Sequence, residues 1–376
     1  MHIAFNGWFW DQPGVGSGQY LRRLVHGLRR IAPDLNMTLV LRPGCTEAED
    51  LPKDVNIVAT GGKRGRWGKI WFEQRIFPQM VERVGADIAH VPYWGPPLRS
   101  PARLVTSVLD VAPLLIQEYA EGLPGRLYTA LVSAAAGGSA HVITLSDAAR
   151  HDIIEYLSIP AEKISVTHLG VDERFHPRMG AEHDEAIREK YDLPDEFVLY
   201  LGGFDIRKQV NMLLLAYTYV GQAEGDNIPL VLAGKEPDWG KKVFPDMRKY
   251  ARQLDIDDYI RWIGYVDEAD KAAVYRLANV FVSPSMYEGF GLPVLEAMAS
   301  GTPVVANKIP VYEEIVGDGA YLVENARTMA GAIIALLLQK PLRDTMINQG
   351  LAQSTRFTWR KTAQATLEVY EKVMQL

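Results

Sequence analysis

Cysteine is almost absent from this chain: Cys45 is the single one among 376 residues, so no disulfide can form within it. Zinc sites of the cysteine-rich kind are excluded for the same reason. The sequence also lacks any apolar run near the ~20 residues that a membrane-spanning helix requires. Its first residues do not resemble a signal peptide. These absences favour a reducing compartment, and we expect a cytoplasmic protein, or one peripheral at the inner face of a membrane.

Positive charge is also scarce. The 40 Lys and Arg residues are outnumbered by 46 Asp and Glu residues, which gives a formal net charge of -6. Proteins that bind nucleic acid usually carry a basic patch or a high pI, so we expect no nucleic-acid partner. No cluster of acids has the pattern of a metal site, and we expect neither a metal nor a cofactor.

What the sequence does contain is an alternation of short apolar runs with longer amphipathic stretches. Many of the runs are apolar throughout, as strands buried on both faces are. We predict strands at 2–8, 38–42, 55–59, 87–91, 103–108, 141–145, 164–168, 197–201, 229–233, 259–263, 279–283, 303–306 and 320–323. Helices are expected between them, for example at 17–31, 147–157, 208–222 and 268–278. This order is typical of α/β folds with parallel sheets.

The length indicates two domains, at ~150 residues per domain. The alternation lapses at 172–194, where prolines and a glycine flank a charged segment. We predict an N-terminal domain over 1–171, a linker over 172–194, a C-terminal domain over 195–357, and a helix over 358–376 that could cross back to the N-terminal domain. Ligands of such folds bind beyond the carboxyl ends of the strands, so we expect a site in the crevice between the domains.

The strongest motif begins where a predicted strand ends, and reads Ser-Pro-Ser-Met-Tyr-Glu-Gly-Phe-Gly-Leu-Pro-Val-Leu-Glu over 283–296. Its glycines let the backbone approach a ligand, and the amides at the following helix start suit a diphosphate. Glu288 can reach a sugar, and Glu296, expected in the first helical turn, can accept hydrogen bonds from vicinal hydroxyls such as those of a ribose. Taken singly, the acids could be a solvated loop residue and a partner of the helix dipole, but their combination with the glycines and Pro293 favours a functional site.

A second motif, Leu-Gly-Gly-Phe-Asp-Ile-Arg-Lys over 201–208, also begins as a strand ends. Its adjacent cations, Arg207 and Lys208, can neutralise a diphosphate and thereby lower the barrier to breaking a glycosyl–phosphate bond. The alternative is a solvated pair at a helix start, but the helix dipole disfavours cations there.

With these two motifs, the chain resembles family 4 of the retaining glycosyltransferases, whose two-domain fold is called GT-B. The resemblance extends over essentially the whole chain and is stronger in the second half. It implies two Rossmann-like domains with parallel sheets facing a central cleft, with Glu288 on the donor sugar and Glu296 on the ribose. The loop amides that would hold the diphosphate are those of Gly289, Phe290, Gly291 and Leu292.

Weaker segments also resemble the family. The turn that would bind the base consists of Gly264, Tyr265 and Val266, and Gly203 lies in the cation motif. Gly16 belongs to a glycine-rich turn that resembles the loop closing over the donor phosphates. That turn lacks the Gly-x-Gly-x-x-Gly spacing, so we disfavour a dinucleotide cofactor.

One departure concerns Leu109-Asp110, where many relatives have His-Asp. A leucine cannot hydrogen-bond or move protons. Asp110 could therefore carry the polar role, or it could be a loop acid that caps local amides.

The segment 63–75 mixes basic and aromatic residues, with Trp67, Ile70, Trp71 and Gln74 on one helical face. A basic amphipathic helix could lie weakly on an anionic membrane, where a lipid-linked acceptor would be found. The favoured alternative is a helix docked on the first sheet through Trp71.

The sequence thus predicts a retaining, metal-independent hexosyltransferase that uses a nucleotide-sugar donor and a saccharide or lipid-linked acceptor. The second motif resembles mannosyltransferases of cell-surface polysaccharide pathways, which favours GDP-mannose. A UDP-sugar donor, a sugar-nucleotide epimerase and an inactive nucleotide-sugar-binding protein remain alternatives. The predicted catalytic residues are Glu288, Lys208, Arg207 and Asp110.

Overall fold

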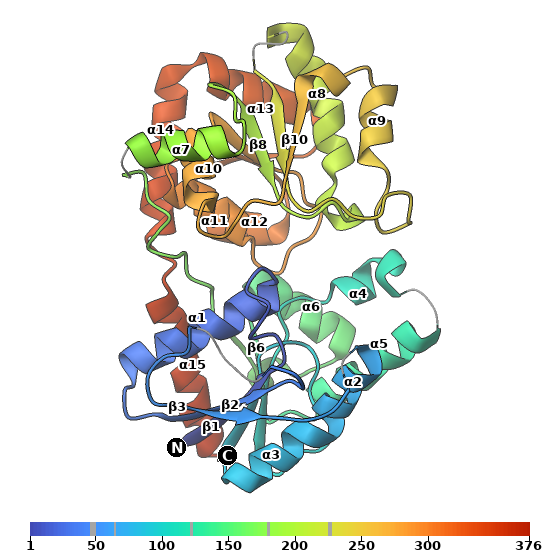
Figure 1. Cartoon of the computed structure of the whole chain (residues 1–376), viewed down its shortest axis with the longest axis vertical. Coiled ribbons are helices and arrows are strands. Elements are labelled where there is room, and N and C mark those ends of the chain that lie inside the picture. Colours follow the sequence, from blue (N-terminus) through green and yellow to red (C-terminus); the bar gives the residue numbers. More distant parts are fainter. Residues whose placement is uncertain (46–49, 64, 121–122, 179–180, 225–227) are drawn as a thin grey trace. The chain divides into compact units, whose positions relative to one another are not determined.

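The computed structural model describes residues 1–45, 50–63, 65–120, 123–178, 181–224 and 228–376. The chain forms two compact units, and the C-terminal helix belongs to the first (Figure 1). Unit 1 comprises Met1–Gly170 and Thr358–Leu376, and unit 2 comprises Val171–Phe357. Among the described residues, no helix has the length and apolarity needed to cross a bilayer.

Unit 1 is built on a parallel sheet with the strand order β3-β2-β1-β4-β5-β6-β7. Its strands are β1 (His2–Gly7), β2 (Asn36–Leu41), β3 (Val55–Ala59), β4 (Ile88–Val91), β5 (Arg103–Ser107), β6 (His141–Thr144) and β7 (Ile164–Val166). Its α-helices are α1 (Gly16–Ile31), α2 (Arg66–Trp71), α3 (Phe77–Val84), α4 (Ala112–Leu115), α5 (Leu123–Gly137), α6 (Asp147–Leu157) and α15 (Trp359–Met374). A π-helix, η1 (Phe72–Ile76), joins α2 to α3, and 3-10 turns lie at η2 (Gln117–Ala120) and η3 (Ala161–Lys163).

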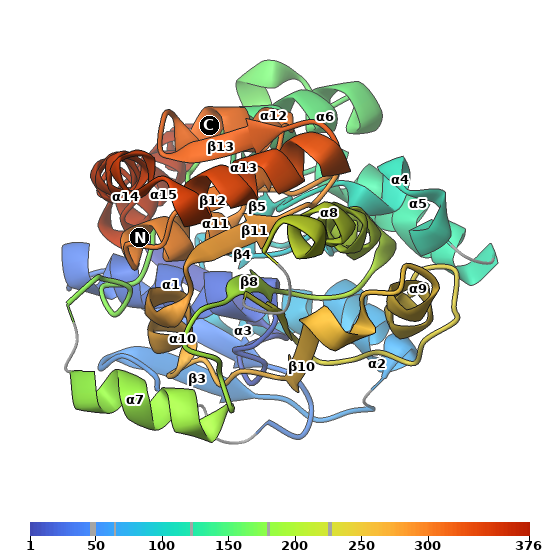
Figure 2. The same cartoon turned by 90° about the horizontal axis from the view of Figure 1, so that it is seen from above.

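Unit 2 repeats this plan with the order β10-β9-β8-β11-β12-β13, again parallel. Its strands are β8 (Val198–Leu201), β9 (Leu230–Ala233), β10 (Ile260–Gly264), β11 (Val280–Ser283), β12 (Val304–Asn307) and β13 (Ala320–Val323). Its α-helices are α7 (Ala181–Lys190), α8 (Val210–Glu224), α9 (Met247–Gln253), α10 (Lys271–Leu277), α11 (Leu292–Ala299), α12 (Pro310–Val316), α13 (Ala326–Leu338) and α14 (Lys340–Ser354). The 3-10 turns are η4 (Ile206–Lys208) and η6 (Asp257–Tyr259). Helices α8 and α13 lie side by side in one hydrophobic core with β8 and β9 (Figure 2).

Every predicted strand is present within two residues of its predicted ends, and the parallel α/β fold is confirmed. The central strands β8, β9 and β11 of unit 2 are buried throughout, which explains why they read as continuous apolar runs. A run of four or five residues is not expected to form a helix instead of a strand, because a helix that short is not stable in water.

The segment 172–194 differs from the predicted linker. It contains α7, which packs on α10 within unit 2 through an ion pair of 2.6 Å between Asp184 and Arg276. The side chains of Ile187 and Leu193 are buried as well. The charged residues that indicated a linker therefore fix a helix to the unit.

The C-terminal helix α15 packs along α1 in unit 1 (Figure 1). The hydroxyl of Tyr370 lies 2.5 Å from Nδ1 of His90 on β4, and Nε2 of His90 lies 2.8 Å from the hydroxyl of Ser107 on β5. Burial lowers the pKa of His90 to about 3, so the ring is neutral at physiological pH. This buried network ties the last helix to the centre of the first sheet.

The prediction that Trp71 docks on the first sheet is wrong. Its side chain is 61% exposed, whereas Phe72 and Phe77 are fully buried. The π-helix at Phe72–Ile76 changes the helical register at this point, so the residue after Trp71 faces the core instead.

Candidate functional site

The two strongest motifs meet at the point in unit 2 where the strand order reverses. Strands β8 and β11 are parallel neighbours there, with Val280 paired to Val198. The loop after β8 carries the cation motif, and the loop after β11 carries Glu288. Since the carboxyl ends of parallel strands share one edge of a sheet, residues 80 positions apart come together.

The Glu288 carboxylate is held by both predicted cations. Its Oε2 lies 2.5 Å from Nη1 of Arg207, and its Oε1 lies 2.6 Å from Nζ of Lys208. The same Arg207 nitrogen also donates to the carbonyl of Tyr287, at 2.9 Å. Asp205 lies 3.6 Å from Nε of Arg207. The sequence indicated that adjacent cations at this position need an anion nearby. In the structure, the carboxylate of Glu288 is such an anion.

Electrostatics keep Glu288 ionised. Burial would raise its pKa, but the charges of Lys208 and Arg207 outweigh burial and lower the pKa to about 2. A carboxylate with so low a pKa is a weak base at neutral pH. Glu288 is therefore suited to accept hydrogen bonds and to offset charge, and poorly suited to remove a proton.

The turn from β11 to α11 depends on one glycine. Gly291 has φ of +105°, and a Cβ there would lie 2.5 Å from Cε1 of the buried Tyr312. Both facts exclude a larger residue. Phe290 is 3% exposed, so only its backbone can face a ligand. Pro293 lies in the first turn of α11, as predicted.

Glu296 lies in the second turn of α11, because the helix begins at Leu292; the prediction of the first turn is wrong. Its side chain is buried and accepts a hydrogen bond of 3.2 Å from the hydroxyl of Tyr275 on α10. Burial raises its pKa, Lys271 and Arg174 lower it, and Glu268 raises it further. Glu296 thus belongs to a charged group drawn from α10 and from the segment after β7.

Backbone atoms line the neighbouring strand ends. The amide of Gly202 donates to Ala233, and that of Gly234 donates to Gly264 at 2.7 Å. A Cβ on Gly234 would lie 2.0 Å from the Gly202 carbonyl oxygen, so the chains can meet only through glycine. Gly203 is exposed beside this junction, and its carbonyl accepts a hydrogen bond from Tyr200.

The three residues of the predicted base-binding turn after β10 differ in backbone conformation and in exposure. Gly264 has φ of +73°, Val266 is buried, and the side chain of Tyr265 is 52% exposed. Tyr265 is therefore the side chain of this turn that can contact a ligand.

The two site residues predicted in unit 1, Gly16 and Asp110, lie on different elements. Gly16 begins α1, and a Cβ added there would have no atom within 4 Å, whereas a Cβ on Gly18 would lie 2.1 Å from the Gln12 carbonyl oxygen. The steric requirement for glycine thus falls on Gly18. Asp110 accepts a hydrogen bond from the Ala112 amide at 3.0 Å at the start of α4, which agrees with the capping alternative.

Sequence reasoning missed the partners that surround the two acids. Tyr275, Lys271 and Arg174 act on Glu296, and Tyr312 and Ser285 lie around Glu288. Ser285 lies inside the 283–296 motif but carried no predicted role. The other four belong to no recognisable motif, because α10, α12 and the segment after β7 approach the site only in the folded unit. Within the described part of the chain, no group of three or more His, Cys, Asp or Glu side chains could hold a metal ion.

The fold is that of the two-domain GT-B proteins. Sucrose-phosphate synthase from Thermosynechococcus elongatus superposes on the chain with a TM-score of 0.80, at 21% identity, over 100% of this chain and 99% of that one. Two family descriptions match in sequence: Glycosyltransferase Family 4 over residues 15–175, and Glycosyl transferases group 1 over residues 183–353. The chain therefore belongs to family 4 of the glycosyltransferases.

Named relatives agree with this assignment. The chain is 28% identical over 376 residues to O-antigen chain mannosyltransferase B of Escherichia coli, with 96% of each chain covered. It is 34% identical over 182 residues to the phosphatidyl-myo-inositol mannosyltransferase of Mycobacterium leprae, which covers 47% of this chain and 46% of the relative.

Proposed function

We propose that this glycosyltransferase moves a mannosyl group from GDP-mannose, with retention, to a hydroxyl of a polysaccharide or glycolipid precursor. The likeness to an O-antigen chain mannosyltransferase over nearly the full length supports the sugar and the type of acceptor. The observation that carries the chemistry is the carboxylate of Glu288 shared by Arg207 and Lys208 at the strand-order reversal of unit 2.

Unit 2 would bind the donor. The cations of Arg207 and Lys208 would meet the diphosphate, together with amides of the loop at 289–292. Glu296 would accept hydrogen bonds from the ribose, and the turn at 264–266 would contact the base. Positive charge fixed beside the leaving group stabilises the negative charge that grows there in the transition state.

The proton balance follows from the pKa of Glu288. In the reaction, the acceptor oxygen bonds to the anomeric carbon, and the bond from that carbon to the diphosphate oxygen breaks. The diphosphate leaves with the electron pair. Since Glu288 has a pKa of about 2, we assign the acceptor proton to the departing diphosphate, and Glu288 to hydrogen bonds with sugar hydroxyls. Asp110 stays a second candidate for a polar role near the acceptor.

We also propose that transfer needs no divalent metal, because the cations of Arg207 and Lys208, which lie together at Glu288, would offset the diphosphate charge in place of one. The test is a calorimetric titration of the protein with GDP, UDP and ADP in buffer containing EDTA. Preferential binding of GDP is expected. Preference for UDP would overturn the donor, and binding that appears only after Mg²⁺ is added would overturn metal independence.

A second measurement separates binding from catalysis. Release of mannose from GDP-mannose, by transfer or by slow hydrolysis, distinguishes an enzyme from a binding protein that lost turnover through Leu109. The Glu296→Ala variant should bind GDP more weakly by about 1–3 kcal/mol. An exposed acid of the same unit, Glu313, provides the matched control as Glu313→Ala. Equal affinity of both variants for GDP would remove Glu296 from the site.

A further inference from the structure

Unit 2 contains a cavity of about 520 Å³, enclosed by the loop after β8, the start of α8, and helix α9 with the residues before it. Helices α8 and α9 lie side by side in both ribbon views (Figures 1 and 2). The volume falls within the ~300–1,000 Å³ typical of sites for small molecules. The residues predicted to bind the donor are all described by the structure, and none of them lines this cavity.

The sheet separates the cavity from the neighbours of Glu296. Val280 and Val282 of β11 belong to the hydrophobic core that α8 and α9 share. Phe281, between them, packs instead on Tyr275 of α10, with ring centres 5.3 Å apart. Side chains alternate between the two faces along a strand, so α9 and α10 cover opposite faces of the sheet. The cavity is therefore not an extension of the site predicted for the ribose.

The floor of the cavity is apolar and is fixed by core packing. Phe204, Val210 and Met247 line it, and each is 5% exposed or less within the hydrophobic core of unit 2. The amide of Ile206 donates to the carbonyl of Val243 at 2.8 Å, which ties the loop after β8 to the loop after β9. A wall held in this way needs little ordering when a ligand binds.

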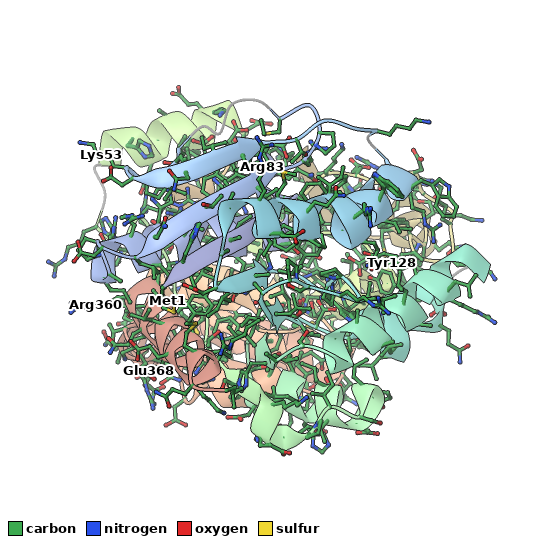
Figure 3. All side chains as sticks on the ribbon, turned by 90° about the horizontal axis from the view of Figure 1, so that it is seen from below. Met1, Lys53, Arg83, Tyr128, Arg360 and Glu368 are labelled. Atoms are coloured by element: carbon green, nitrogen blue, oxygen red, sulfur yellow. The ribbon has the colours of Figure 1, made fainter. Side chains whose placement is uncertain are left out.

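Polar side chains complete the lining. Within the described part of the chain, those that form no hydrogen bond with the protein are Gln209, Asn211, Tyr250 and Gln253. Polar side chains elsewhere pair with one another, as in unit 1, where the hydroxyl of Tyr128 on α5 donates to Glu73 at 3.1 Å from Oε2 (Figure 3). Carboxamides and a phenol can each donate and accept. The cavity thus keeps hydrogen-bonding capacity of both kinds for a ligand.

The charges of the lining disfavour an anionic ligand. The charged lining residues are Asp205, Asp246 and Lys249, which set two carboxylates against one ammonium group. A phosphate or a nucleotide would therefore meet like charge, which is costly. A saccharide without charge suits this lining better, because its hydroxyls pair with carboxamides and its C–H faces pack on an apolar floor.

We infer that this cavity binds a neutral saccharide, namely a sugar of the acceptor glycan that is removed from the reacting hydroxyl. The loop after β8 contributes to both places. It gives Arg207 and Lys208 to Glu288, and its Asp205 and Gln209 line the cavity. A glycan held there is anchored beside the donor groups, which raises the effective concentration of its reacting end. The inference rests on the proposed function for the origin of the saccharide.

The experiment is a calorimetric titration of the full chain, in saturating GDP, with mannotetraose, maltotetraose and methyl α-mannoside. GDP fills the donor site, so the heat of saccharide binding comes from elsewhere. We expect mannotetraose to bind, and methyl α-mannoside to bind more weakly because it makes fewer contacts. The N211A/Q253A variant should weaken mannotetraose binding by about tenfold, the scale of two lost hydrogen bonds between neutral groups.

The matched control is N348A/Q349A, which removes the same two side-chain types from exposed positions of α14 and should bind mannotetraose like the unaltered chain. GDP titration of each variant checks the fold and tests the donor site separately, so failure of the proposed function is distinguishable from failure of the cavity.

Equal affinity of N211A/Q253A and the unaltered chain for mannotetraose would overturn the inference. So would the absence of binding by both tetrasaccharides, or displacement of mannotetraose by inorganic phosphate, which would indicate an anion site. Equal affinity for methyl α-mannoside and mannotetraose would overturn the assignment to a glycan, because the cavity would then serve a free sugar.

Discussion

The two units share a topology but differ at the point where their strand order reverses. In unit 2, the loops after β8 and β11 bring two cations within 2.6 Å of one carboxylate. In unit 1, the same point lies between β1 and β4, and the rings of Phe9 and Tyr93 close it with their centres 4.9 Å apart. The comparison teaches that the fold supplies a location, while the side chains after two neighbouring strands decide whether it is charged or packed.

The buried acids near these two points have pKa values shifted in opposite directions. Glu288 has two cations at hydrogen-bond distance, and its pKa falls to about 2 despite burial. Glu73 is fully buried, and burial raises its pKa even though Lys69 and Tyr128 act in the opposite direction. One cation at 3.3 Å does not offset burial, whereas two at 2.5–2.6 Å do.

The largest expected effect is that of Lys208→Ala. Removing a fixed charge that acts on the leaving group should lower turnover by about 10²–10³-fold, and GDP affinity by less, because the charge of the diphosphate grows in the transition state. Initial rates of GDP release and calorimetry measure the two quantities. Lys249→Ala, an exposed lysine of the same unit, should leave both unchanged. Unaltered turnover in Lys208→Ala would reduce the unit 2 cluster to a structural ion pair.

The two acids should differ in how much stability is lost when their charge is removed. Glu288→Gln should lower the free energy of unfolding at pH 7 by about 3 kcal/mol, the scale of its pKa depression. Glu73→Gln should cost under about 1 kcal/mol, because that site disfavours the ionised form and Lys69 is partly exposed. Urea unfolding of both variants measures the difference. Equal losses would show that the two sites are electrostatically alike.

The contributions of Glu288 and Glu73 to stability should depend on pH with opposite sign. The folded pKa of Glu288 lies below the ordinary value of 4.5, so its contribution is present above about pH 4.5 and is lost as the pH falls toward 2. The folded pKa of Glu73 lies above 4.5, so its contribution is complete below that pH and is lost as the pH rises through the folded value. Unfolding of the two Gln variants from pH 3 to pH 8 should show opposite slopes relative to the unaltered chain.

A smaller effect is expected from Tyr370→Phe. The variant removes the hydroxyl that lies 2.5 Å from His90 and leaves a buried ring nitrogen unpaired, which should cost about 1–2 kcal/mol of stability. Because the change lies in unit 1, the affinity for GDP should not move. A parallel loss of GDP affinity would mean that α15 influences the donor domain.

The smallest effect is that of Gln209→Asn. Gln209 follows Arg207 and Lys208 in the loop after β8 and has φ of +45°, a conformation that asparagine adopts more readily than glutamine. The exchange should stabilise the protein by about 0.5 kcal/mol with unchanged turnover, as measured by thermal unfolding and rate assays. Destabilisation would show that the Gln209 side chain makes a contribution of its own.

Some features of this protein were determined by the sequence alone. Continuous apolar runs predicted the strands, because a strand of a parallel sheet is covered on both faces and therefore needs apolar side chains on both. The loop glycines, Pro293 and the two acids predicted a candidate site, because they follow one another within a single loop and the helix after it. Strands and loop motifs of this kind can be read from the sequence because they depend on residues that follow one another in the chain.

Other features were decided only by the tertiary structure. The meeting of Arg207 and Lys208 with Glu288 depends on β8 and β11 being neighbours, and the charged group around Glu296 depends on the packing of α10. The exposure of Trp71 follows from a π-helix that the sequence pattern did not predict, and the anchoring of α15 follows from its packing on α1 and from the buried contact between Tyr370 and His90. Burial, pKa and the direction of a side chain depend on neighbours distant in sequence, and folding brings those neighbours together.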